Sequence, residues 1–416
     1  MYALCDCNNF FVSCERVFNP SLNTRPVVVL SNNDGCVIAR SNEAKSLGIA
    51  MAVPFFQIKH LVKKHNIAVY STNFTLYGDM STRVMTILSG LVPDIEIYSI
   101  DEAFLHLEGI PDLEQYTRHI VDTTSRSTGI PVSLGVAPTK TLAKIANHFA
   151  KKYKGYNQLC LIDTEEKRIK ALQMTEIGDV WGIGRNHRRE LRYHSINTAY
   201  DFTQKSRSWV RSKMSVVGER TWLELHGTPC IGKDDVEADK QMICTSRSFG
   251  QPVSGYDNLM AAVASLAALS VGKLRRQKSA AKAVYVFVQT NRFKDDLYKP
   301  SKMIPLSFYT SDLAEITSYC RLALDSIYID ALEYKRAGVV LMDITDEAYV
   351  MRDLFDPVDR ERQARLSKAL DAIMIRNGRE AVKVAAEGSG YKPNIIQEHL
   401  SRRYTTNLNE IIEVKI

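Results

Sequence analysis

Short apolar runs alternate with helical patterns along the first part of the chain. Two of these runs flank Asp101 and Glu102, which predicts a strand, a tight reversal at the two acids and a returning strand. A third apolar strand, from Tyr2 to Cys5, leads directly into Asp6. Three carboxylates at strand ends can converge if those strands are neighbours in one sheet.

The same pattern divides the rest of the chain. It predicts one α+β layer that carries the acids, interrupted by a small α/β insertion. The sequence is then wholly helical from Asp163 to Gly227. After a charged linker, a separate α/β unit begins at Met242, in the predicted order strand, helix, two strands, helix, strand. Beyond this unit we predict one further helix, Asp359–Arg376.

Composition narrows the class of protein only slightly. An apolar fraction of 45% and a charged fraction of 24% are typical of globular proteins. The net charge of +7 permits a polyanionic partner without requiring one. The N-terminus does not resemble a secretory signal, and the longest apolar run, Asn258–Gly272, is too short to span a bilayer. We therefore expect a cytoplasmic protein without a membrane segment.

The eight cysteines are scattered and include no Cys-x-x-Cys pair. This spacing disfavours a zinc site and predicts mostly buried thiols in a reducing compartment.

The acidic pair Asp101-Glu102 has two interpretations. Aspartate is common in turns, so the pair can be a polar hairpin tip. Two negative charges between apolar strands are unfavourable unless something compensates them. Hard carboxylate oxygens suit Mg²⁺, which favours a divalent-cation site, with Asp6 as the third acid.

Basic residues gather on a predicted helix that begins at Lys140. Five lysines and no acid lie between Lys140 and Lys154, while the other face of the helix is apolar. Such a run is most often a solvated surface. Beside a carboxylate metal site, the lysines can instead face phosphates.

Two further basic clusters are candidate DNA contacts. Gly182 and Gly184 precede a helix with Arg185 and Arg188, which resembles a helix-hairpin-helix whose backbone N–H groups approach a phosphate; the alternative is a tight turn. A second cluster closes a predicted helix in the last α/β unit, where the alternative is a solvated helix end. Its members are Lys273, Arg275, Arg276, Lys278 and Lys282, of which the first three are the candidate DNA contacts.

Three stretches together resemble the Y-family translesion DNA polymerases. They are Asp6–Phe11, which follows a strand, Tyr98–Phe104 and Gly135–Ala146. A fourth stretch, Ser31–Arg40, is similar to the UmuC branch of that family, the catalytic subunit of the bacterial SOS mutagenic polymerase.

The resemblance implies a multidomain α+β protein with the right-hand polymerase fold. It implies error-prone translesion synthesis, in which a deoxynucleotide is transferred to a primer 3′-hydroxyl under template direction during SOS DNA-damage tolerance. The implied parts are a palm (1–19 and 78–165), fingers (20–77), a helical thumb with the helix-hairpin-helix (166–232), a linker (233–241), an α/β little finger (242–345) and a C-terminal tail (346–416).

The resemblance also implies a two-metal centre. Asp6 and Asp101 would bridge two Mg²⁺ ions, for which Mn²⁺ can substitute. Glu102 would hold the ion that activates the primer hydroxyl, and the backbone carbonyl of Cys7 would complete the nucleotide-side site.

Nucleotide contacts are implied in the same way. Phe11 matches the steric gate that excludes a 2′-hydroxyl, and the neighbouring Phe10 is either a second nucleotide contact or a core residue. Lys45 and Lys151 match positions that contact the triphosphate. The chain departs from many family members, which have Tyr and Arg where it has Asn42 and Lys45.

The implied partners are primer-template DNA, a dNTP, a processed UmuD-like dimer, a recombinase filament and a sliding clamp. For the clamp, Leu354 and Phe355 resemble the end of a clamp-binding peptide, although a local packing contact explains them equally well. Two other hypotheses stay open: a palm-type nucleotidyl cyclase without a template, and a non-catalytic DNA-binding scaffold of a damage-response complex.

Overall fold

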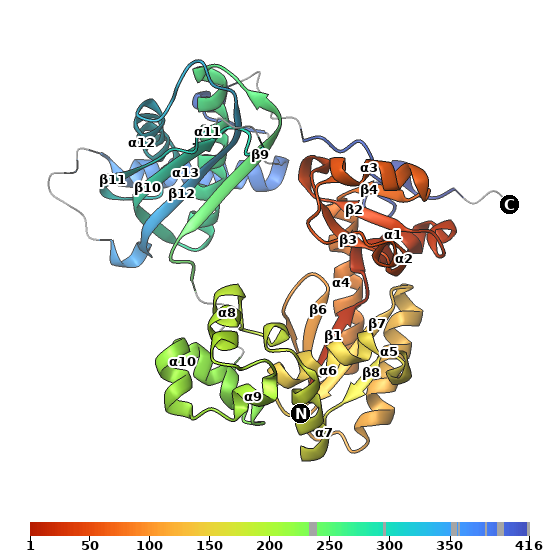
Figure 1. Ribbon diagram of the computed structural model, residues 1–416. Coiled ribbons are helices and arrows are strands. Elements are labelled where there is room, and N and C mark those ends of the chain that lie inside the picture. The colour runs from red at the N-terminus through yellow and green to blue at the C-terminus, as the bar shows by residue number, and fades with distance from the viewer. Residues whose placement is uncertain are drawn as a thin grey trace. The chain divides into compact units, whose positions relative to one another are not determined.

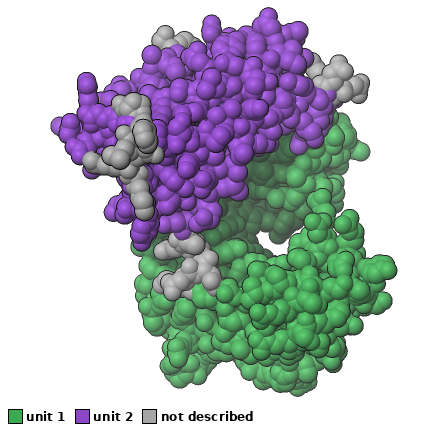
Figure 2. Space-filling model, turned by 90° about the vertical axis from the view of Figure 1, so that its left-hand side faces the viewer, with its two compact units in different colours: residues 1–237, 397–416 green, residues 238–396 purple. Residues whose placement is uncertain are grey.

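The computed structural model describes residues 1–232, 239–293, 297–350, 356, 358–378, 381–388 and 395–413. The chain forms two compact units, one of residues 1–237 with 397–416 and one of residues 238–396 (Figure 2). Each unit has its own hydrophobic core.

The first unit is organised around a five-stranded sheet with the order β5-β6-β1-β7-β8 (Figure 1). The central strand β1 pairs antiparallel with β6 and β7, and β8 joins β7 in parallel. The strands are β1 (Tyr2–Cys7), β5 (Asp94–Ile97), β6 (Glu102–His106), β7 (Val132–Ala137) and β8 (Leu159–Leu161).

The predicted hairpin exists, but its reversal lies earlier than predicted. β5 ends at Ile97, and Glu102 is already the first residue of β6, so the chain turns over residues 98–101. The Ser99 hydroxyl fixes this turn by accepting hydrogen bonds from the amides of Asp101 and Glu102, at 3.2 and 3.1 Å.

Alternating residues of the sheet face two different layers of helices. Ala3 and Cys5 face a core formed with α1 (Phe10–Phe18), α4 (Phe74–Leu91) and α5 (Leu113–Thr128). Leu4 and Phe104 face the opposite core, which includes α6 (Lys140–Lys152). Because side chains alternate along a strand, Asp6 and Glu102 lie on the same face as Leu4 and Phe104, toward α6.

Helix α6 lies unusually close to the sheet. A Cβ atom on Gly135 would lie 2.0 Å from the Asn147 backbone N and 2.4 Å from the Ala143 O. The Asn147 side chain donates to the backbone O atoms of Leu4 and Ser133, at 3.2 and 2.7 Å. A glycine in the strand and an amide in the helix therefore set the spacing between α6 and the acidic strands.

The insertion folds as a three-stranded sheet with the order β3-β2-β4, which places β4 at an edge. The sheet has its own small core of valines, leucine and isoleucines. Its elements are β2 (Val27–Leu30), β3 (Val37–Arg40), α2 (Asn42–Ser46), α3 (Phe55–Lys64) and β4 (Ala68–Ser71).

The predicted helical region follows β8 and shares a core with α6. It contains α7 (Glu165–Met174), a 3₁₀ turn (Ile177–Asp179), α8 (Arg185–Tyr193), α9 (Ala199–Thr203) and α10 (Arg207–Leu225).

The second unit has the predicted order of strands and helices. An antiparallel sheet, β11-β10-β12-β9, packs against α11 and α12. Helix α11 is long and apolar enough to cross a membrane, yet most of it is buried in this unit, as expected of a core helix. The elements are β9 (Ile243–Val253), α11 (Tyr256–Arg276), β10 (Ser279–Gln289), β11 (Ser301–Thr310), α12 (Leu313–Asp325) and β12 (Tyr334–Asp346).

The predicted C-terminal tail is not a single segment. The predicted helix is present as α13 (Arg360–Asn377) in the second unit, whereas residues 397–413 belong to the first unit. All eight cysteines lie in the described part of the chain; none forms a disulfide, and five are buried as expected.

Gly135→Ala should destabilise the first unit by more than about 3 kcal/mol, because the new methyl group would overlap the backbone of α6. We expect the melting temperature of this unit to fall by roughly 6–12 °C in a thermal scan. Gly155→Ala is the control, since nothing lies within 4 Å of its Cβ position. Equal melting temperatures for both variants would contradict the close approach of α6.

Candidate active site

Backbone pairing brings the three acids together where β1 ends and β6 begins. Asp6 of β1 lies directly opposite Glu102 of β6. The Cys7 amide donates to the Asp101 backbone O at 2.8 Å. Residues almost a hundred positions apart therefore become neighbours through strand pairing alone.

Lysines of α6 provide the opposite charge. Lys151 Nζ lies 2.5 Å from Asp6 Oδ2, and Lys144 Nζ lies 3.0 Å from both carboxylate oxygens of Glu102. At the start of the helix, Lys140 Nζ lies 2.5 Å from Glu96 Oε2. The stripe of lysines thus faces carboxylates of the sheet.

The phosphate-facing interpretation of the stripe is wrong for Lys140. Its side chain is only 2% exposed, and that of its partner Glu96 is 6% exposed. The helical spacing of the lysines was visible in the sequence, but their partners come from distant strands.

Asp6 is held in an environment that disfavours its charge. Burial raises the pKa of its carboxyl group, and repulsion from Asp101 and Glu102 adds to this rise, while Lys151 opposes it. A carboxylate in this position gains stability from any further cation that approaches it.

Asp101 is oriented by the turn that precedes it. The Ser99 hydroxyl donates to Asp101 Oδ1 at 2.5 Å while it accepts from two backbone amides. Ser99 is a site residue that sequence reasoning missed, although its place two residues before an aspartate in a turn is a signal that was available.

The donor set fits Mg²⁺ in chemistry, because it consists of carboxylate oxygens. In the described ranges, no three Asp, Glu, His or Cys side chains are arranged to hold a metal ion. The reason is local: two of the three acids point toward lysines. A metal ion bound between these residues would compete with the two lysines for the carboxylate oxygens.

Three cations lie near one another where the insertion meets the sheet. Partial burial lowers the pKa of Lys45, and repulsion from Arg40 and Lys151 lowers it further. Lys45 Nζ donates to Oδ1 of Asn9 and of Asn42, at 2.7 and 3.1 Å. This cluster suits a polyanion such as a triphosphate, and Arg40 was not predicted as a member.

Phe11 and Phe10 occupy different environments. Phe11 is partly buried, and its ring is stacked on Tyr77 with centroids 4.6 Å apart. Phe10 is 4% exposed and belongs to the hydrophobic core. The structure therefore favours the core alternative for Phe10 over a nucleotide contact.

Comparisons with known proteins decide the family. Residues 5–148 match the model of the impB/mucB/samB family, and residues 240–354 match the model of its C-terminal domain. Protein UmuC of Salmonella typhimurium is 41% identical over the full length of both chains. The chain belongs to the UmuC family. Residues 364–414 of this UmuC-family chain match a domain of unknown function.

More distant relatives connect the UmuC-family chain with Y-family DNA polymerases. DNA polymerase IV of Moorella thermoacetica is 27% identical over 93% of this chain and 96% of its own length. A Y-family DNA polymerase chimera based on Dbh shares the fold, with a TM-score of 0.65 at 21% identity over 83% of this chain and 99% of its own. The predicted family, enzyme class and fold are confirmed.

The helical region of the UmuC-family chain contacts the acidic hairpin through Trp181. This ring packs edge-on against Tyr98, with centroids 5.6 Å apart, and lies close to Phe104. Lys144 Nζ lies 4.4 Å from the Tyr98 centroid and 5.2 Å from that of Trp181. The lysine that pairs with Glu102 is therefore also held by cation–π contacts, which the sequence did not reveal.

The predicted helix-hairpin-helix has the glycine conformation that its turn requires. Gly182 has φ of +89°, and a Cβ atom there would lie 2.9 Å from Thr221 Oγ1. Gly184 is the N-cap residue of α8, and no side chain caps the amides of the first turn of this helix. Arg185 is exposed. Arg188 is engaged at 3.4 Å by Glu176. Contact with DNA phosphates at this turn stays a prediction.

The basic cluster of the second unit is only partly available for DNA. Arg275 forms hydrogen bonds of 2.8 and 2.6 Å with Asp371 of α13, so we reassign it to packing within this unit. Lys273 donates to Thr245 Oγ1 at 3.1 Å, whereas Arg276 is exposed. The proposed clamp residues Leu354 and Phe355 lie outside the described residues.

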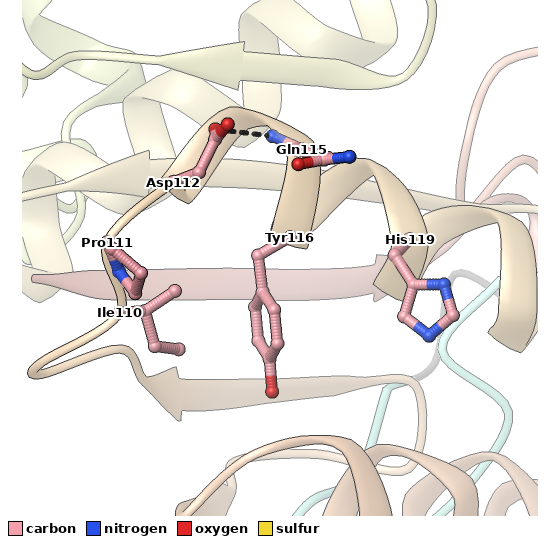
Figure 3. Close-up of a pocket in the computed structure, with 6 residues that line it drawn as sticks. All are labelled: Ile110, Pro111, Asp112, Gln115, Tyr116 and His119. Carbon is pink, nitrogen blue, oxygen red and sulfur yellow. Dashed lines mark hydrogen bonds between the residues drawn. The ribbon is translucent and has the colours of Figure 1, made fainter.

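A surface hollow of about 380 Å³ is lined by residues between Ile110 and His119, shortly after β6 in the chain (Figure 3). It surrounds the start of α5, where Asp112 caps the helix by accepting from the Gln115 amide at 3.0 Å. The hollow follows the end of β6 opposite to Glu102, so we assign it no role in the site.

Lys140→Met should cost about 3–5 kcal/mol of stability, because Glu96 is left buried without its partner. The double variant Lys140→Met, Glu96→Leu should recover most of this loss. Lys167→Met, which breaks the exposed pair with Asp163, should cost less than about 1 kcal/mol. Unfolding in urea measures all three variants, and a double variant as unstable as the single one would refute the pairing.

Proposed function

We propose that this UmuC-family polymerase carries out template-directed, error-prone translesion synthesis by a two-metal mechanism in the SOS response to DNA damage. One observation supports the proposal most strongly: Asp6 lies opposite Glu102 and next to Asp101, and Lys144 and Lys151 contact two of these acids, with Lys45 close to both Arg40 and Lys151. The three acids can bind metal ions, and the nearby cations can bind the triphosphate.

The acids would hold two Mg²⁺ ions, or Mn²⁺ ions, with help from the Cys7 carbonyl. When bound, the ions would stabilise negative charge on the attacking and leaving oxygens of the transfer. In their absence, Lys144 and Lys151 compensate the negative charges of Glu102 and Asp6. Lys151 then becomes available for a phosphate group.

Substrate binding would use the cations between the insertion and the sheet. Lys45 and Arg40 would contact the triphosphate, and a polyanion there would relieve the repulsion that lowers the pKa of Lys45. Phe11, supported by Tyr77, would lie against the sugar and exclude a ribose 2′-hydroxyl.

Primer-template DNA and a dNTP are the proposed partners. A solved structure of similar fold is titled an insertion ternary complex of Dbh DNA polymerase, with a TM-score of 0.50 at 20% identity. The UmuD-like dimer, the recombinase filament and the sliding clamp are proposed from membership of the UmuC family alone. No observation favours the scaffold or cyclase hypotheses.

Asp101→Ala should reduce primer extension on the order of a thousandfold, because losing a metal ligand removes several kcal/mol of charge stabilisation. Binding to primer-template DNA, measured by fluorescence anisotropy, should persist. Asp122→Ala, an exposed acid of α5, is the control and should extend primers normally. Extension by Asp101→Ala at the wild-type rate would refute the proposed mechanism.

Phe11→Ala should admit ribonucleotides, because its ring is the proposed barrier to a 2′-hydroxyl. We expect the ratio of kcat/KM for dNTP over rNTP to fall by roughly tenfold or more in single-nucleotide incorporation. Phe293→Ala changes an exposed phenylalanine of the second unit and should leave the ratio unchanged. Unaltered sugar selection in Phe11→Ala would remove Phe11 from the site.

A further inference from the structure

The C-terminal segment 397–413 packs on the first unit, although more than 300 positions separate it from the residues it contacts. In Figure 1 the segment passes the elements of the insertion. At the edge strand β4, the Ser71 amide donates to the His399 O at 2.9 Å. The His399 amide donates to Ser71 Oγ at 3.0 Å. The segment thus satisfies one backbone amide that the edge strand β4 would leave exposed, and it also bonds the Ser71 side chain.

Asn73 connects this segment with the first turn of α4. Asn73 Oδ1 accepts from the Leu76 amide at 3.2 Å and caps the helix. Its Nδ2 atom donates to the O and Oγ atoms of Ser401, at 3.2 and 3.0 Å. Because Asn73 is 2% exposed, these partners replace water around a buried amide.

A buried carboxylate continues the connection toward Phe11. Glu15 is 2% exposed, and its Oε1 atom accepts from Ser401 Oγ at 2.8 Å and from Tyr77 OH at 2.7 Å. Burial raises the pKa of Glu15, and the two hydroxyl donors oppose that rise. Tyr77 is fully buried, and its ring is the one stacked on Phe11.

Further contacts fix the segment on both sides of Ser401. The Tyr404 ring stacks on Phe18 of α1, with centroids 4.8 Å apart and an interplanar angle of 11°. The Gln397 side chain donates to the Thr72 O at 2.9 Å. Ser401 is therefore held in place by an aromatic contact on one side and by hydrogen bonds on the other.

We propose that residues 397–413 form an intramolecular strap that positions Tyr77, and through it Phe11, with Ser401 as the positioning residue. The proposal rests on the proposed function, because Phe11 acts on the sugar only if the chain is a polymerase. It assigns a role to the end of the matched domain of unknown function, which covers residues 364–414.

The Ser401 hydroxyl restricts the movement of the Glu15 carboxylate. Two hydroxyl groups share one of its oxygens, so removing the Ser401 hydroxyl leaves Tyr77 as the described donor to that atom. A buried carboxylate with fewer donors is less stable in its position, and the Tyr77 hydroxyl moves with it. The ring of Tyr77 then supports Phe11 less firmly, while the carboxylates of the sheet edge are unaffected.

Ser401→Val and Ser401→Thr test the strap, because valine and threonine have the same shape and differ in the hydroxyl group. In single-nucleotide incorporation, Ser401→Val should lower the preference for dNTP over rNTP by roughly three- to tenfold, mainly through a lower KM for the ribonucleotide. Ser401→Thr should keep the wild-type preference. Ser89→Ala, an exposed serine further along α4, is a control that should also keep it.

Hydrogen–deuterium exchange gives a readout that does not depend on activity. Amides in the first turn of α4 should exchange faster in Ser401→Val than in Ser401→Thr. If Ser401→Val matches Ser401→Thr in sugar preference and in exchange, the strap proposal is wrong. If the wild-type chain does not extend primers, the proposed function fails instead, and the exchange measurement alone decides whether the strap supports α4.

Discussion

The structure depends on the ion pairs between α6 and the acidic strands. Strand pairing places Asp6 opposite Glu102 and beside Asp101, an arrangement that is unfavourable without positive charge nearby. Lys144 and Lys151 supply that charge from one helix face. They can do so only because Gly135 allows α6 to approach the sheet. The charge balance of the site therefore depends on how closely the core helix α6 packs on the sheet.

The same ion pairs connect the parts of the first unit. Lys144 lies among the rings of Tyr98 and Trp181, so the helical region contacts the lysine that holds Glu102. Repulsion from Lys151 contributes to the lowered pKa of Lys45, which connects the insertion with Asp6. Ligand binding at these acids would therefore change the partners of residues from three parts of the chain.

Local patterns predicted the elements well, and long-range polar partners poorly. Apolar runs predicted the strands around Asp6 and Glu102 and the element order of the second unit, because burial imposes those patterns. The pairing of Lys140 with Glu96 and of Arg275 with Asp371 depends on which elements become neighbours, which periodicity does not reveal. The packing of residues 397–413 was not predicted, because most of their contacts use backbone and polar groups, with the Tyr404 ring as an isolated aromatic contact, and follow no repeat.

In the proposed mechanism, Asp6 and Glu102 exchange lysine partners for metal ions when substrate binds. A crystal structure with primer-template DNA, Mg²⁺ and a non-hydrolysable dNTP analogue tests it most directly. We expect two ions between Asp6, Asp101 and Glu102, with Lys144 and Lys151 no longer in contact with those carboxylates. Carboxylates still paired with both lysines, and no ion between them, would contradict it.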